Sequence, residues 1–149
     1  MNSLVELYDK YKDLGLEILA FPCDQFNKKH KMKIKESDIK EIAHEKYNAD
    51  FPFFYKVKVN GKDTSEIFKF LRSTTPSLVD KHEHPHYHSG DMAPKIKDLP
   101  SDFCKFLVDS NGHVVDYLPG DSEDPIKLEQ RIRKFLGISH TSWVQFKID

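Results

Sequence analysis

The amino-acid sequence predicts an α/β fold, and three observations lead to this prediction. A helical pattern at residues 3–14 runs directly into LEILAFP at residues 16–22, a short and almost wholly apolar run that is typical of a strand buried on both faces. An alternating pattern at residues 103–118 indicates a β-hairpin. A helical pattern with a proline near its start closes the chain at residues 125–136. A helix that leads straight into a buried strand favours parallel pairing in a sheet covered by helices.

The two helices of the N-terminal half carry start and stop signals. In the first, the spacing of Ser3 and Glu6 is that of a capping box, and Gly15 marks the end. The second is predicted at residues 37–47 with Ser37 as its N-cap. Its inner side is expected to carry the apolar residues Ile39, Ile42, Ala43 and Tyr47.

The middle of the chain is less regular. Val57 and Val59 alternate before an Asn60-Gly61 turn, and a short helical stretch follows at residues 67–71. Residues 73–100 are rich in Pro, Ser, Asp, Lys and His and show no sustained period, so we expect a long surface loop. FCKFLVD at residues 103–109 then forms the first strand of the hairpin, residues 110–112 its turn, and HVVDYL its second strand.

Size, charge and cysteine content limit the possible classes of protein. The chain has 149 residues, the size of one domain, and its 23 basic side chains are interleaved with 24 acidic ones, which gives no argument for nucleic acid. Its longest apolar runs fall far short of the ~20 residues that span a bilayer. The charged first residues do not resemble a signal peptide, and two cysteines make no disulfide framework. We therefore expect a cytoplasmic protein without a membrane span; the oligomeric state is left open.

Four segments in succession resemble the glutathione peroxidase family. LYDKYKDLGLEILAFPCDQF is similar to the family's helix-strand-loop block, and FPFFYKVKVNGKD resembles its FPxFxKVxVNG pattern. SDFCKFLVDSNGHVVDYLP and LEQRIRKFLG are similar to its hairpin and its terminal helix. On this basis we expect residues 1–137 to form one glutathione peroxidase-like domain with a His-rich loop at residues 73–100, followed by a tail at residues 138–149.

The resemblance implies a thioredoxin-like three-layer fold and the reduction of hydrogen peroxide and organic or lipid hydroperoxides in the response to oxidative stress. It implies glutathione or another thiol as co-substrate and no bound cofactor. In the family the reacting Cys or selenocysteine precedes the first helix, so it is expected upstream of Ser3, together with the first, central core strand of the sheet. A chain that lacks that strand is expected to be marginally stable. The alternative is a non-catalytic homologue that binds other molecules through its His-rich loop or open strand edges.

Three family side chains that activate the reacting thiolate can be placed one at a time. The Gln corresponds to Gln25, whose amide can donate a hydrogen bond to a sulfur anion or a peroxide oxygen. The Trp and Asn positions hold Ser101 and Asp102. The Ser101 hydroxyl is too short to replace an indole N–H, and an ionised Asp102 only accepts hydrogen bonds and raises the pKa of a nearby thiol. The resemblance therefore implies a weakened peroxidase.

Cys23 is a candidate substitute nucleophile. It ends the predicted strand next to Gln25, and Lys28, Lys29 and His30 follow closely enough to favour a thiolate. The family keeps this Cys without using it as the reacting residue, so the resemblance favours a partly buried structural thiol.

The remaining sulfur and imidazole groups suggest little further chemistry. Cys104 is expected to be an inert thiol in a buried strand. His44 occupies the position at which thioredoxin-dependent members carry a resolving Cys, so the resemblance leaves only a glutathione-type cycle. Four alternating histidines occur in the predicted loop, but their spacing is not that of a folded zinc site, so we expect no metal site; they are His82, His84, His86 and His88.

Overall fold

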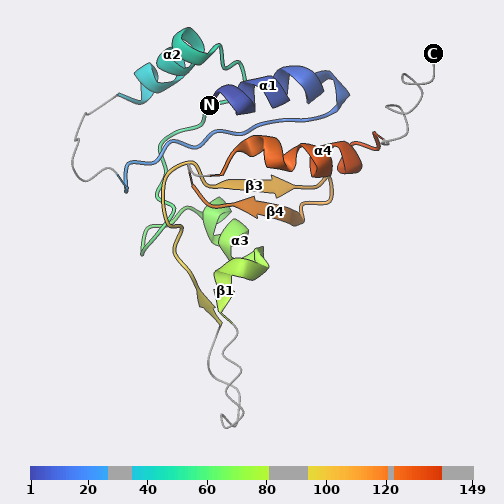
Figure 1. Cartoon of the computed structure of the whole chain (residues 1–149). Coiled ribbons are helices and arrows are strands. Elements are labelled where there is room, and N and C mark those ends of the chain that lie inside the picture. The colour runs from blue at the N-terminus through green and yellow to red at the C-terminus, as the bar shows by residue number, and fades with distance from the viewer. Residues whose placement is uncertain (27–34, 81–93, 121–122, 139–149) are drawn as a thin grey trace, which may run out of the picture. The chain divides into compact units, whose positions relative to one another are not determined.

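The computed structural model describes residues 1–26, 35–80, 94–120 and 123–138 (Figure 1). The chain divides into two compact units. The first unit comprises Met1–Pro22, Lys33–Tyr55 and Glu123–Asp149, and the second comprises Cys23–Met32 and Lys56–Ser122. Helices and two small antiparallel sheets occur in this fold, so the α/β prediction is confirmed. The prediction of a single domain over residues 1–137 stays a prediction.

The first unit begins with the predicted helix. Helix α1 spans Asn2–Tyr11 and continues as the 3-10 helix η1, Lys12–Leu14, which ends at Gly15 with a φ of 113°. A left-handed φ of this kind favours glycine because it has no Cβ. The predicted capping box is wrong, because the helix begins at Asn2 and Ser3 lies inside it without capping it.

Helix α2 spans Glu36–Tyr47 and confirms the second predicted helix, although not its cap. Lys35 occupies the N-cap position, and the hydroxyl of Ser37 instead donates to Asp38 Oδ1 over 2.8 Å. Of the four apolar residues expected on its inner side, only Ala43 is buried, and Ile42 is 43% exposed. Ile39 and Tyr47 are partly buried, so the inner side of the helix is less buried than the sequence predicts.

Residues 16–22 do not form the strand buried on both faces that the sequence predicts. Ala20 makes one parallel bridge with Phe53, in which Ala20 N donates to Pro52 O over 2.9 Å and Phe54 N donates to Ala20 O over 2.8 Å. Leu19 is 49% exposed. The parallel direction was predicted correctly, but a single bridge in the described part of the chain does not make a regular ladder.

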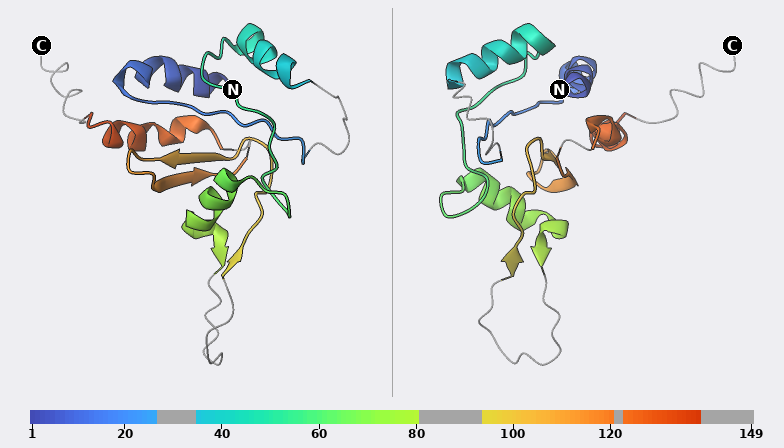
Figure 2. Two further views of the ribbon diagram at one scale, coloured as in Figure 1. Left: turned by 180° about the vertical axis from the view of Figure 1, so that it is seen from behind. Right: turned by 60° about the vertical axis from the view of Figure 1, so that its left-hand side comes forward.

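Aromatic rings and two further helices complete the core of the first unit. Phe51 is 2% exposed and lies between Phe53, at a ring-centroid distance of 5.4 Å, and Tyr8, at 5.6 Å. The predicted C-terminal helix forms as η3, Pro125–Leu128, and α4, Glu129–Phe135, and ends at Gly137. Its first turn is capped by Asp124, whose Oδ1 accepts from Ile126 N. Helix α1 packs against η3, as two orientations show (Figures 1 and 2).

The second unit contains more structure than the sequence predicts between residues 66 and 100. Helix α3 spans Glu66–Thr74 and η2 spans Pro76–Leu78. Strands β1, Val79–Asp80, and β2, Lys95–Ile96, pair in antiparallel fashion. Leu78 and Leu99 are 5% and 3% exposed, so the prediction of a surface loop over residues 73–100 is wrong at both ends, where apolar side chains reach a core. Its middle lies outside the described residues.

The predicted hairpin is confirmed in the second unit. Strand β3, Lys105–Val108, pairs with β4, Val114–Leu118, with Phe106 opposite Tyr117. The turn closes through Gly112 N donating to Asp109 O over 3.1 Å. The Asn60-Gly61 turn also forms, with a φ of 84° at Gly61, but no strand forms at the alternating valines before it.

Candidate active site

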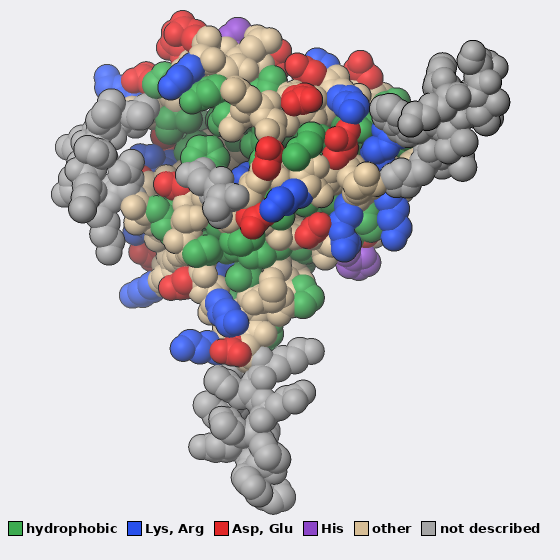
Figure 3. Space-filling model, in the orientation of Figure 1, with side chains coloured by type: hydrophobic (Ala, Val, Ile, Leu, Met, Phe, Trp, Pro, Cys, Tyr) green, Lys and Arg blue, Asp and Glu red, His purple; other side chains and the backbone are tan. Residues whose placement is uncertain are grey.

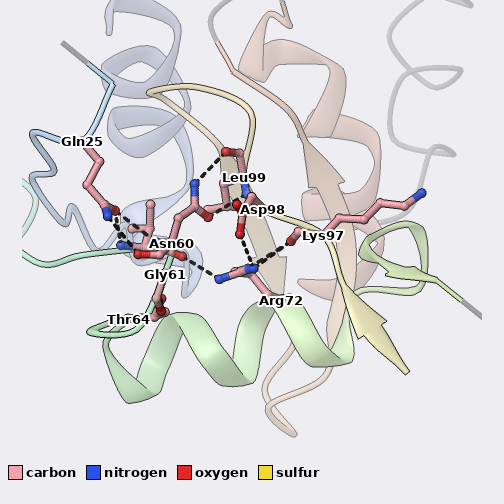
Figure 4. A network of polar contacts seen from close by, with 9 residues as sticks. Gln25, Asn60, Gly61, Thr64, Arg72, Lys97, Asp98 and Leu99 are labelled. Atoms are coloured by element: carbon pink, nitrogen blue, oxygen red, sulfur yellow. Dashed lines mark hydrogen bonds and ion pairs between the residues drawn. The ribbon is translucent and has the colours of Figure 1, made fainter. Parts of the chain in front are cut away.

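Gln25 lies in a bend directly after Cys23 and Asp24, and its side-chain amide is bound to backbone. Its Oε1 accepts from Val59 N over 2.7 Å and from Asn60 N over 3.1 Å, and its Nε2 donates to Asn60 O over 2.9 Å (Figure 4). Two backbone donors on Oε1 fix which end of the amide is oxygen. Residues 23–25 are therefore held against the Asn60-Gly61 turn.

The side chain of Asn60 continues this network to a distant segment. Its Nδ2 donates to Leu99 O over 2.9 Å and its Oδ1 accepts from Leu99 N over 2.8 Å. Two residues paired in a β-sheet exchange the same two bonds, one N–H to O in each direction, but here the Asn60 side-chain amide replaces one of the two backbones. Asn60 is thus more than the turn residue that the sequence predicts, because it fixes the segment that leads to Ser101 and Asp102.

Arg72 joins the same two segments from helix α3. Its Nη1 donates to Val59 O over 3.0 Å, its Nε and Nη2 donate to Lys97 O over 3.1 and 3.0 Å, and Nη2 also lies 2.9 Å from Asp98 Oδ1. The Arg72 residue is 8% exposed, and Figure 4 shows its guanidinium pointing from the helix toward both segments. The planar fork of an arginine suits several fixed acceptors at once.

Ser101 and Asp102 lie in a tight turn before β3. The Ser101 hydroxyl donates to Asp102 O over 3.2 Å, and Phe103 has a φ of 62°, in the left-handed region. Ser101 also lies against Gly120, where an added Cβ would be 2.1 Å from Ser101 Oγ. The short side chain at residue 101 is therefore engaged with its own turn.

Cys23 shares its surroundings with both Gln25 and Asp102. The thiol is half-buried, and its Sγ donates to Gln25 Oε1 over 3.6 Å. Burial raises the pKa of Cys23, the carboxylates of Asp102 and Asp24 raise it further, and the backbone N–H groups of Gln25 and Val59 oppose the rise. The structure thus brings Cys23 and Gln25 together, and burial and the charge of Asp102 disfavour the Cys23 thiolate.

The three cationic residues expected to favour that thiolate, Lys28, Lys29 and His30, lie outside the described residues. Within the described part, Lys56 Nζ lies 3.4 Å from Asp24 Oδ2, which places one ion pair next to Cys23 in sequence. The balance around the sulfur agrees with the interpretation of Cys23 as a structural thiol. Its reactivity stays a prediction.

Cys104 comes directly before β3 and not within it, which corrects its predicted place in the strand. Its Sγ donates to Ser101 O over 3.2 Å and lies 3.7 Å from the Tyr117 hydroxyl. Burial and the neighbouring thiol raise the pKa of Tyr117 well above its usual value. Cys104 therefore supports the turn that carries Ser101.

The predicted histidine features are only partly within the structure. His44 lies on α2 with Nε2 3.2 Å from Asp50 Oδ1, and both side chains are largely exposed. The run from His82 to His88 lies outside the described residues. Across the residues that are described, no three His, Cys, Asp or Glu side chains form a group that could hold a metal ion.

Figure 3 shows acidic and basic side chains interspersed over the face drawn, as the sequence composition suggests. None of the helices in the described ranges is both long and apolar enough to cross a membrane.

Sequence reasoning missed Asn60 and Arg72. Arg72 had a detectable signal, because it follows Phe68 and Leu71 at the spacing of one buried helix face. A charged residue on such a face is rarely buried without partners. Asn60 had no comparable signal, since an Asn-Gly pair is explained fully by a turn.

Comparisons with known proteins point to one family. A family model described as glutathione peroxidase matches residues 1–72. The chain is 39% identical over 139 residues to a probable phospholipid hydroperoxide glutathione peroxidase of Solanum lycopersicum, covering 93% of this chain and 70% of that protein. It is 37% identical over 139 residues to the probable phospholipid hydroperoxide glutathione peroxidase 6, mitochondrial, of Arabidopsis thaliana, covering 93% of this chain and 51% of that protein.

Solved structures agree at the level of fold. The crystal structure of Trgpx in apo form superposes with a TM-score of 0.62 at 22% identity, covering 91% of this chain and 69% of that one. That of T. cruzi GPX1 superposes with a TM-score of 0.55 at 25% identity, with the same coverage. These similarities confirm the fold expected from the sequence blocks.

Proposed function

Because the chain belongs to the glutathione peroxidase family, we propose that it takes part in the thiol-dependent reduction of hydroperoxides. In this reaction the O–O bond breaks, two thiols give up two electrons and two protons, and the products are an alcohol, water and a disulfide. The relatives named phospholipid hydroperoxide glutathione peroxidase support lipid hydroperoxides as substrates beside hydrogen peroxide. No observation in the comparisons favours a non-catalytic homologue.

The observation that carries the proposal is the state of the Gln25 amide. Its oxygen is occupied by two backbone N–H groups and one N–H of Nε2 is given to Asn60 O. An amide nitrogen has two N–H donors, and no described residue accepts the second. The amide is fixed and has one donor left, which is what a developing sulfur or oxygen anion requires.

The proposed reaction is slowed by the two substituted positions. Asp102 places a carboxylate where the family has an amide donor, and its charge already raises the pKa of the Cys23 thiol. The Ser101 hydroxyl is directed to Asp102 O and offers no long-range donor. A reacting thiol held beside these residues is therefore a weaker thiolate than in the family pattern.

Glutathione is the proposed reductant, and no bound cofactor is required. His44 stands where a resolving Cys would be needed for a thioredoxin-type cycle, and its imidazole faces Asp50. The cytoplasm is the proposed compartment; relatives include a putative glutathione peroxidase 7, chloroplastic, and a mitochondrial form, so location varies in the family.

The test is peroxide turnover by the natural gene product, whose intact mass identifies the chain assayed. We expect oxidation of glutathione that depends on hydrogen peroxide or on a phospholipid hydroperoxide. Gln25→Glu keeps the acceptor for Val59 N but removes both N–H donors, the one bound to Asn60 O and the free one, and adds a negative charge; it should lower turnover by at least about 10²-fold, the cost of losing one preorganised donor. Gln130→Ala, at an exposed position of α4, is the matched control. Absence of turnover in the unaltered protein, or full turnover in Gln25→Glu, contradicts the proposal.

A further inference from the structure

Two segments of the second unit, residues 58–60 and 97–99, lie together without forming a sheet. No strand includes either segment among the described residues. Their attachment consists of side-chain bonds to backbone: the two bonds between Asn60 and Leu99, and the bonds of Arg72 to Val59 O and Lys97 O. The register between these segments therefore depends on two side chains.

Each segment carries one end of the candidate site. Gln25 is bound to Val59 and Asn60 through three hydrogen bonds. Ser101 and Asp102 follow Leu99 by only two and three residues. A change in register between the segments would thus move Asp102 relative to Gln25 and Cys23.

The two side chains differ in how they fix this register. Asn60 is bidentate to a single residue, Leu99, and so sets the alignment of one backbone on the other. Arg72 is rooted in helix α3 and reaches both segments from one side, and Asp98 Oδ1 completes its set of acceptors. Together they make a clamp, named here the 60–72 clamp.

We propose that the 60–72 clamp sets the position of Asp102 relative to Gln25, so that Asn60 and Arg72 are positioning residues of the peroxidase site. That these residues serve a peroxidase site rests on the proposed function. The geometric part, that the clamp fixes the turn that carries Asp102 relative to the segment that binds Gln25, stands without it.

A double-mutant cycle read at Cys23 tests the geometric part. The rate of Cys23 alkylation is measured from pH 6 to pH 10 by peptide mass spectrometry, which follows Cys104 separately, in the unaltered chain, Asp102→Asn, Asn60→Ala and the double variant. In the unaltered chain, removal of the Asp102 charge should speed alkylation at neutral pH by about two- to fivefold. In the Asn60→Ala background the same change should have almost no effect.

Matched variants separate positioning from general loosening. Asn111→Ala is the control, because Asn111 is an exposed turn residue whose side chain makes no hydrogen bond within the described ranges. Should Asn60→Ala fail to fold, Asn60→Asp keeps the acceptor for Leu99 N, loses the donor to Leu99 O and adds a negative charge, so its own alkylation rate is the reference for adding Asp102→Asn. Arg72→Lys keeps the charge without the planar fork of the guanidinium. Like Asn60→Ala, it should reduce the increase in the Cys23 alkylation rate that Asp102→Asn causes.

The outcomes are distinct. An Asp102→Asn effect of equal size with and without Asn60 overturns the clamp, and so does the lack of any such effect in the unaltered chain. Loss of the effect in Asn60→Ala, but not in Asn111→Ala, supports it. If the cycle shows the loss and the unaltered protein has no peroxide turnover, the clamp stands and the proposed function fails.

Discussion

Two pairs of distant segments meet in this chain, and they are held together by different forces. In the first unit, residues 16–22 meet residues 51–55 through one parallel bridge at Ala20 and through stacked rings such as Phe21 on Phe54, at 4.8 Å. In the second unit, residues 58–60 meet residues 97–99 through the 60–72 clamp. The first attachment is mainly apolar and the second is polar and directional.

The difference shows that hydrogen bonds from side chains to backbone can align two segments that form no β-ladder. Burial of aromatic rings stabilises the fold in proportion to the apolar area removed from water, and this contribution changes little when the rings shift slightly. Hydrogen bonds from side chains to backbone fix a single alignment and are costly to leave unmade once buried. The polar attachment therefore suits the segment that carries Gln25 and Asp102, where alignment decides the chemistry.

The largest expected effect is in the apolar attachment. Phe51→Ala removes a ring that is 2% exposed and packs on Phe53 and Tyr8, so the free energy of unfolding should fall by about 3–5 kcal/mol. Urea denaturation followed by circular dichroism measures it. Tyr55→Ala, at a position that is 82% exposed, should change stability by less than about 0.5 kcal/mol. A similar loss in both variants would mean that rings do not hold this attachment.

Arg72→Met is expected to have the next largest effect, in the polar attachment. It leaves Val59 O and Lys97 O without their charged donor, and unmet buried acceptors should lower stability by about 2–4 kcal/mol. Lys69→Met on the same helix is the control, because Lys69 is exposed and pairs only with Glu66 among the described residues. Equal denaturation midpoints for the two variants would show that the clamp contributes nothing to stability.

Gly120→Ala sharpens the comparison at the turn of Ser101. Both Gly120 and Gly61 have a left-handed φ, of 66° and 84°, but an added Cβ meets Ser101 Oγ at 2.1 Å only at Gly120. Gly61→Ala should cost about 1 kcal/mol from backbone strain alone, and Gly120→Ala about 2 kcal/mol because the serine must also move. Thermal denaturation of the two variants compares them directly, and a larger cost at Gly61 would refute the steric account.

Local patterns were sufficient to predict the helices and the hairpin. The periodic residues of α1 and the alternation around the Ser110 to Gly112 turn depend on neighbours close in sequence. Long-range pairing was not predictable in the same way. LEILAFP is typical of a strand buried on both faces, but its exposure depends on which elements pack on it, and Leu19 is 49% exposed.

The candidate site likewise has one part that was predictable from the sequence and one part that was not. Gln25 was found through a resemblance of sequence blocks, and the structure adds which of its donors is free. The clamp was not found, because Asn60 and Arg72 act on the backbone of Leu99, Lys97 and Val59. The spacing of Arg72 after Phe68 and Leu71 indicates that it is buried, but backbone acceptors are the same for every residue type, so the sequence does not show which ones it binds.

The smallest expected effect is a pH dependence in the first unit. Glu129 Oε1 accepts from the Lys10 ammonium over 2.5 Å and from the Tyr11 hydroxyl over 2.6 Å, and these partners hold the pKa of Glu129 below its usual value. A carboxylate whose folded-state pKa is depressed stabilises the fold above its unfolded pKa, near ~4.3, and the contribution is lost as the pH falls through the folded value.

Glu129→Gln should therefore lower stability at pH 7 by about 0.5–1 kcal/mol, a modest figure because Lys10 is half exposed. The difference in the free energy of unfolding between this variant and the unaltered chain, here called the gap, should disappear as the pH falls below about 4, since protonation of Glu129 removes the same charge. Urea midpoints at pH 7, 5 and 3 measure the gap. Glu66→Gln, whose side chain is 88% exposed, should show almost no gap at any pH. A difference in stability that stayed constant down to pH 3 would show that the charge of Glu129 does not stabilise this contact.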